Sequence, residues 1–98
     1  MSEAVVSPSG PLETVPVEFE EILIDDQLVV EFDQLLGART AITGRVTAVI
    51  YNGSDPAIVL EDPSETEYRV DEEAVEQLGG RGTVGENPDL NAVREVVR

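Results

Sequence analysis

The sequence contains no cysteine, histidine, tryptophan or lysine, and its six cationic residues are all arginine. Without cysteine there is no disulfide framework, thiol nucleophile or thiolate metal site. Without histidine and lysine, the most common general base and several nucleophiles are missing. The serines lie near the N-terminus or in predicted turns, with no plausible base nearby, at positions 2, 7, 9, 54 and 64. We therefore expect a protein that is not an enzyme and that holds no cofactor.

Long hydrophobic runs are also absent. No apolar run approaches the about 20 residues that a helix needs to cross a bilayer, so no membrane span is expected. The first residues, Met1-Ser2-Glu3, lack the basic start and apolar block of a secretory signal, which predicts a cytoplasmic location. The 98 residues suffice for one domain with one modest core, because a chain of this size buries roughly two-thirds of its unfolded surface.

Negative charge dominates the composition. Twenty-one Asp and Glu residues face six arginines, which gives a formal net charge of −15 and a pI near 4.1. High net charge with low hydrophobicity is typical of disorder, but 41% of the residues are hydrophobic and they fall in periodic segments, so we expect a folded domain. An acid-rich chain with no lysine or cysteine and few aromatics resembles the cytoplasmic proteins of salt-accumulating haloarchaea. This resemblance implies that high salt is required, and it implies nothing about activity.

The stretch from Thr40 to Asp71 predicts three successive strands. Its first part alternates at a period of two, which is typical of a strand over residues 41–52, and we expect Val46 and Ile50 to face the core. Turn residues at 52–56 lead to a return strand, and a second turn at 62–64 leads to a third. The two following strands are expected at residues 57–61 and 67–70.

The N-terminal region has little periodicity. Residues 1–14 are predicted to be a flexible tail, and residues 15–98 a single small β-barrel domain. Because Pro16 cannot donate a hydrogen bond to a neighbouring strand, the segment around it can only be an edge strand or an extended lead-in.

Residues 20–36 suit either a helix or a strand. The adjacent Val29 and Val30 favour a strand over residues 27–32, because β-branched side chains lose rotamer freedom in a helix. The helical alternative ends at Gly37 and rests on the i, i+4, i+7 and i+8 spacing of Leu28, Phe32, Leu35 and Leu36.

The C-terminal part is less regular. Asp71 is predicted to cap a short helix over residues 72–78. Residues 79–88 contain four glycines, an asparagine and a proline, and we expect a loop there. Residues 88–98 suit a closing strand because of their valines, or a helix with one apolar face formed by Leu90, Val93 and Val97.

Together these segments predict a mainly β fold: a small five-stranded barrel with one short helix. From Gln27 to Val97 the chain resembles SH3-like and Sm-like barrels. The resemblance rests on the strand order, on Gly44-Arg45-Val46 in the long strand, and on Ile58-Val59-Leu60-Glu61-Asp62 after the turn. Arg81-Gly82-Thr83-Val84 echoes the Arg-Gly element of Sm-like proteins, which implies RNA binding. The Asp/Asn base-binding signature of that family is missing from the turn at 51–56, so no RNA-binding role is assigned to these residues.

Other patterns are interpreted as surface. Residues 61–67 crowd four carboxylates into one turn without EF-hand spacing, so no metal site is predicted. The glycine-rich residues 79–85 match neither phosphate-binding fingerprint and are interpreted as a connector. The acidic pairs are interpreted as solvated surface at 20–21, 25–26, 61–62 and 72–73.

Arginine is rare enough here for its positions to be informative. Four residues of the predicted long strand share one face, Arg69 lies on another predicted strand, and Arg81 follows the strands. The possible contact face comprises Arg45, Thr47, Val49, Tyr51, Arg69 and Arg81. Pairing of these arginines with carboxylates is the alternative. The function expected is a non-enzymatic interaction module that binds a protein partner or its own copies. A nucleic-acid-associated small barrel, acting on RNA or DNA, is the alternative.

Overall fold

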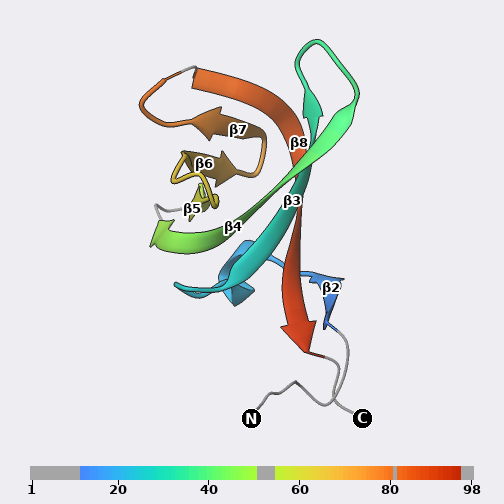
Figure 1. Cartoon of the computed structure of the whole chain (residues 1–98), viewed down its shortest axis with the longest axis vertical. Coiled ribbons are helices and arrows are strands. Elements are labelled where there is room, and N and C mark those ends of the chain that lie inside the picture. The colour runs from blue at the N-terminus through green and yellow to red at the C-terminus, as the bar shows by residue number, and fades with distance from the viewer. Residues whose placement is uncertain (1–11, 51–54, 81, 96–98) are drawn as a thin grey trace.

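The computed structural model describes residues 12–50, 55–80 and 82–95. In chain order the elements are β2 (Leu12–Pro16), η1 (Phe19–Glu21, one 3-10 turn), β3 (Gln27–Gln34), β4 (Arg39–Ile50), β5 (Ala57–Glu61), β6 (Glu67–Asp71), β7 (Ala74–Gln77) and β8 (Gly82–Glu95). All strand pairs are antiparallel, in the order β2-β8-β3-β4-β5-β6-β7, and β8 also pairs with β7. This last pairing closes β3 to β8 into a six-stranded barrel (Figure 1).

The mainly β fold is confirmed, but the predicted five strands and one short helix are wrong in detail. The segment expected to be a helix over residues 72–78 forms β7, which pairs with β6 on one side and β8 on the other. Asp71 Oδ1 accepts hydrogen bonds from the backbone amides of Glu73 and Ala74, at 2.8 Å each. An aspartate that bonds the backbone two and three residues ahead closes a tight turn. The turn lets Val75 point inward, where it is fully buried.

The segment expected to be a loop, residues 79–88, also belongs largely to a strand. β8 begins at Gly82, runs through these residues and continues to Glu95, which settles residues 88–95 as strand. Asn87 has a positive φ of 56°. The pairing of β3 with β8 shifts by one residue between Glu31 and Asp33, opposite Asn87 and Pro88. The turn-forming residues therefore mark a bulge that bends one long strand.

Two glycines allow strands to approach closely. A Cβ on Gly85 would lie 2.1 Å from a ring carbon of Phe32, so this ring occupies the space over the glycine. A Cβ on Gly44 would lie 2.7 Å from the carbonyl oxygen of Glu61. These glycines serve packing between strands, because a side chain at either position would collide with a neighbouring strand.

The N-terminal half agrees better with the sequence. The strand predicted over residues 27–32 is confirmed and extends to Gln34. β2 pairs only with the C-terminal half of β8 and is an edge strand, as Pro16 requires. Residues 1–11 of the predicted tail lie outside the described residues, while its last residues, 12–14, belong to β2.

A bulge in β4 changes which side chains face the core. Val46 pairs with Leu60, but Ala48 pairs with Val59, so one extra residue, Thr47, interrupts the register. Side chains after a bulge exchange faces. Val46 is fully buried and Val49 packs against the core, whereas Ile50 is 37% exposed. The predicted inward position of Ile50 is therefore wrong.

The core fills the barrel with aliphatic side chains from every barrel strand. Leu28 and Val30 of β3, Ile58 and Leu60 of β5, and Val75 of β7 are at most 1% exposed. None of the described polar or charged side chains is buried. The described residues include no helix long and apolar enough to cross a membrane.

Candidate functional site

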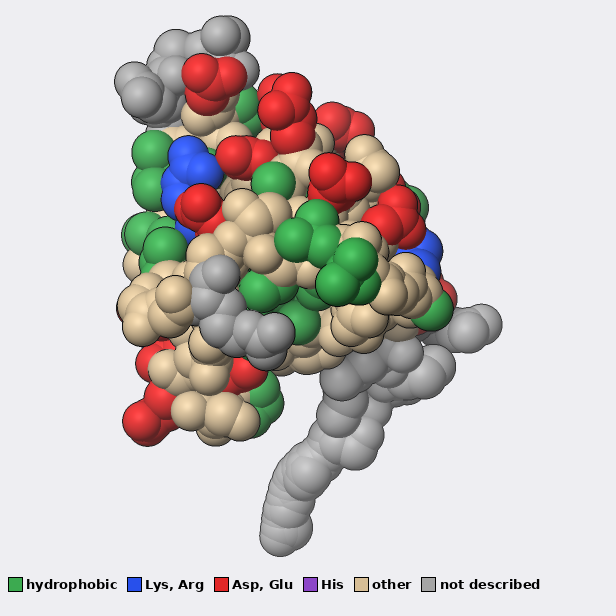
Figure 2. Space-filling view, turned by 90° about the horizontal axis from the view of Figure 1, so that it is seen from above, with side chains coloured by type: hydrophobic (Ala, Val, Ile, Leu, Met, Phe, Trp, Pro, Cys, Tyr) green, Lys and Arg blue, Asp and Glu red, His purple; other side chains and the backbone are tan. Residues whose placement is uncertain are grey.

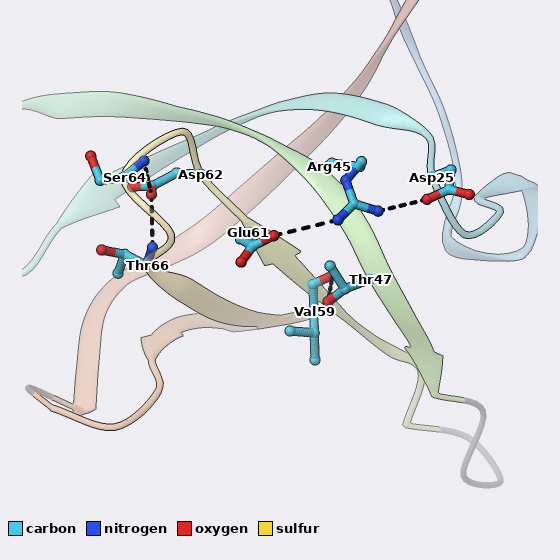
Figure 3. A network of polar contacts seen from close by, with 8 residues as sticks. All are labelled: Asp25, Arg45, Thr47, Val59, Glu61, Asp62, Ser64 and Thr66. Carbon is cyan, nitrogen blue, oxygen red and sulfur yellow. Dashed lines mark hydrogen bonds and ion pairs between the residues drawn. The ribbon is translucent and has the colours of Figure 1, made fainter.

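The described residues of the contact face predicted on β4 do not all lie on one face. Tyr51 and Arg81 lie outside the described residues. The bulge at Thr47 turns Val49 toward the core, away from the face that Arg45 occupies. The Thr47 hydroxyl donates a hydrogen bond to the carbonyl oxygen of Val59 at 3.4 Å (Figure 3). Thr47 therefore joins β4 to β5 beside the bulge.

Arg45 bridges two carboxylates from different parts of the chain. It lies 2.6 Å from Asp25, which precedes β3, and 3.4 Å from Glu61 at the end of β5 (Figure 3). The Arg45 side chain is 50% exposed. Exposed pairs of this kind each stabilise a fold by about 0–1 kcal/mol. The contacts connect neighbouring strands, and they occupy the guanidinium that a phosphate group would need.

Arg39 belongs to a second polar cluster, near the C-terminal end of β3. It pairs with Asp33 at 2.9 Å and also with Asp89 of β8. Asn87 Nδ2 donates a hydrogen bond to the other oxygen of Asp33 at 3.1 Å. The hydrogen bonds from Asn87 and then Arg39 hold the pKa of Asp33 below its ordinary value of 3.8. This cluster fastens β8 to the β3–β4 pair where the bulge interrupts their register.

The remaining described arginines are paired as well. Arg69 lies 3.1 Å from Asp71, and Arg94 lies 3.8 Å from Asp26. Each of the four arginines in the described residues therefore faces at least one carboxylate, as the alternative interpretation of the sequence proposed. Arg45 and Arg69 bind different acids on different strands and do not converge on one site.

Several acidic residues build turns. Asp62 accepts hydrogen bonds from the backbone amides of Ser64 and Thr66, both at 2.9 Å (Figure 3). Asp71 acts in the same way before β7. Burial acts to raise the pKa of Asp71, but the two backbone amides and Arg69 together lower it below its ordinary value. Among the described residues no group of acidic side chains is arranged to hold a metal ion.

An uncharged groove that the sequence analysis did not predict lies at one end of the barrel, between the β3–β4 hairpin and the β7–β8 connection. Its volume is about 510 Å³. We call it the leucine groove. Its apolar lining consists of Phe32, Leu35, Leu36, Ile42, Tyr68 and Val84. Its polar lining consists of Gln34, Thr40, Gln77 and Thr83.

The floor of the leucine groove packs against the core, whereas one of its walls is exposed to solvent. Phe32 is only 3% exposed, and Ile42, Tyr68 and Val84 pack against the core. Leu35 is 52% exposed, and Leu36, at the turn between β3 and β4, is completely exposed. Figure 2, viewed from this end of the barrel, shows hydrophobic side chains gathered near the centre of the face, with acidic side chains on several sides. Such an apolar surface is a candidate for contact with another molecule.

One sequence signal points to this groove. Leu35 and Leu36 are neighbours, and two adjacent side chains of a strand point to opposite faces, so both cannot enter one core. The helical alternative treated them as part of one apolar stripe. Their exposure follows from the hairpin, which ends β3 at Gln34 and begins β4 at Arg39.

Other hollows are less suited to an apolar partner. One of about 520 Å³ beside β2 includes Glu18, Glu31, Glu72 and Asp89 in its lining. One of about 300 Å³ beside β6 has a mostly acidic lining together with Arg69. The leucine groove is the one of these three whose lining carries no charge.

Comparison of the chain with protein-family models, with curated proteins and with solved structures gives no match. Function is therefore inferred from the surfaces described above.

Proposed function

We propose that this protein is a non-enzymatic interaction module that binds a protein through the leucine groove. The observation that carries the proposal is the exposure of Leu35 and Leu36 beside an uncharged groove, in a chain with 21 acidic residues. Full burial of one leucine side chain is favourable by about 1.5–3 kcal/mol. Covering both leucines supplies a large part of the free energy that a specific contact needs.

The position of the groove supports the same proposal. Its floor belongs to the core and its strands are tied by closed pairing, so the site exists before the partner arrives. A preformed site saves the entropy of ordering a loop on binding. The exposed wall lies on the β3–β4 hairpin, which can adjust to a partner without disturbing the barrel. We also propose, from the sequence resemblance alone, that the barrel is SH3-like.

The alternative role in nucleic-acid binding receives less support. Binding to nucleic acid draws affinity from lysine and arginine that neutralise phosphates. This chain has no lysine, and Arg39, Arg45, Arg69 and Arg94 already face carboxylates. An enzymatic role would need a general base or nucleophile, and the composition offers only carboxylates and hydroxyls for these tasks.

A variant pair tests the proposal. Leu35→Ser with Leu36→Ser removes the apolar wall of the groove. Leu23→Ser with Ile24→Ser is the matched control, because these two residues are also adjacent and exposed, at 68% and 59%, in the connection before β3. Immobilised wild type and both variants are compared for proteins captured from a lysate of the source cells, with quantitative mass spectrometry. Self-association is measured in parallel by sedimentation velocity.

We expect a captured protein, or a self-associated species, that the groove variant loses and the control keeps. Thermal melts verify that both variants are folded, which their exposure makes the expected result. Binding that both variants retain would exclude the leucine groove as the contact surface.

A further inference from the structure

We infer that the occupant of the leucine groove is a segment of a different protein, with an apolar centre and flanking lysine or arginine residues. This inference rests on the proposed function and specifies the partner. It follows from three features of the molecule: the uncharged lining of the groove, the acidity around it, and the exposed leucine at its edge.

The lining favours an apolar centre. None of its ten residues is charged. A lysine or arginine placed inside would lose hydration without gaining a carboxylate partner, which is unfavourable. The four polar residues of the lining carry amides and hydroxyls. These groups can exchange hydrogen bonds with the backbone of a bound segment while its apolar side chains cover Phe32 and Ile42.

The surroundings favour cationic flanks. The chain carries a net charge of −15, and the arginines of the described residues are already engaged with carboxylates. Glu67 and Glu76 directly precede the lining residues Tyr68 and Gln77, and because adjacent side chains of a strand point to opposite faces, both carboxylates lie on the outer face of the barrel beside the groove. A segment with lysine or arginine on both sides of its apolar centre is attracted by this field, and its flanks, which extend past the groove, can reach these acids on the outer side of the rim.

The same charge disfavours a second copy as the occupant. Two copies would each bring a charge of −15 to the contact, and like charges across an interface oppose association. A chain segment also fits better than a small ligand. A small molecule inside the groove would leave the completely exposed Leu36 in water, whereas a segment crossing the hairpin would cover it.

The test selects from a displayed library of random 12-residue peptides on the immobilised full chain, at the lowest KCl concentration that keeps it folded. Peptides whose binding is lost with Leu35→Ser and Leu36→Ser are sequenced, and their affinities are measured by fluorescence anisotropy. We expect apolar centres with enriched lysine or arginine on the flanks. Leu36→Ala should weaken their binding about tenfold or more.

Two charge variants locate the attraction. Glu67→Gln with Glu76→Gln should weaken binding about fivefold, because two rim contacts are lost. Glu13→Gln with Glu20→Gln removes the same charge from β2 and η1, at the opposite end in Figure 1, and should change affinity less than twofold. Equal effects of the two variants would overturn the assignment of the cationic flanks to this rim.

The remaining outcomes separate this inference from the proposed function. Groove-dependent peptides without cationic flanks would overturn the inference and leave the proposed function intact. A dimer that dissociates on Leu35→Ser and Leu36→Ser would also overturn it, in favour of a second copy. Peptides that bind equally well to this groove variant would overturn both.

Discussion

Ile58 and Ile50 are the same amino acid on adjacent strands, and the barrel uses them differently. Ile58 is fully buried and pairs with Val49, while Ile50 follows the bulge and is 37% exposed. Truncating a buried isoleucine to alanine removes apolar contacts and leaves a cavity, which costs about 2–5 kcal/mol. Ile58→Ala should therefore lower the free energy of unfolding by this amount.

Ile50→Ala is the matched control and should cost less than about 1 kcal/mol, because its side chain keeps much of its contact with water. Both values come from urea denaturation at a fixed KCl concentration. Similar losses from the two variants would show that β4 has no bulge at Thr47 and that strict alternation continues to its end.

Ile50 also shows why the inward and outward faces of a strand cannot always be predicted from the sequence. Alternation places Gly44 and Val46 correctly on the buried face of β4. A bulge is set by pairing with β5, across a turn, and the composition of residues 46–48 carries no sign of it. Beyond the bulge, alternation therefore assigns Val49 and Ile50 to the wrong faces, and Val49 does not share the face of Arg45.

At the scale of elements, the hydrogen bonds of the turn before β7 make the free energy of unfolding depend on pH. The pKa of Asp71 is lowered by hydrogen bonds from Glu73 and Ala74 and by Arg69, against the opposing effect of burial. A carboxylate whose pKa is lower in the folded state than the ordinary 3.8 stabilises the fold above that value. The contribution disappears as the pH falls through the folded pKa. Asp71→Asn should cost about 1 kcal/mol at pH 7.

The difference in unfolding free energy between wild type and Asp71→Asn should shrink as the pH falls below about 4 and through the folded-state pKa of Asp71. Urea denaturation across this range measures it. Glu73→Gln removes one charge from the same turn but no accepted hydrogen bond, so its difference from wild type should lack this pH dependence. A constant difference for Asp71→Asn would mean that its charge contributes nothing to the turn.

Elements with strong periodicity were predictable, and elements made by tertiary pairing were not. β3, β4, β5 and β6 follow from alternation and turn residues. β7 was expected to be a helix because Asp71 followed by acids and then two glycines satisfies the rules for a capped helix. It is a strand because closure of the barrel needs one between β6 and β8. The leucine groove is lined by five strands and by the turn between β3 and β4, so its residues have no pattern in common along the sequence.

At the scale of the whole molecule, two electrostatic effects of salt oppose each other. Salt weakens the exposed ion pairs of Arg39 and Arg45, which stabilise the fold little because water already screens them. Salt also screens repulsion among the carboxylates. With 21 acids and six arginines, 15 negative charges are not balanced by a positive charge of this chain. The second effect therefore outweighs the first.

The melting temperature should consequently rise with KCl between 0.1 and 3 M. Most of the rise should occur below about 1 M, because the screening length falls from about 10 Å to about 3 Å over that range. Circular dichroism melts measure it. Glu13→Gln, Glu20→Gln and Glu67→Gln together form the control, since all three side chains are exposed and none forms an ion pair with another described residue. This variant should melt higher than wild type at 0.1 M and show a smaller rise. A melting temperature that stays constant from 0.1 to 3 M would contradict both the repulsion and the resemblance to proteins of salt-rich cytoplasm.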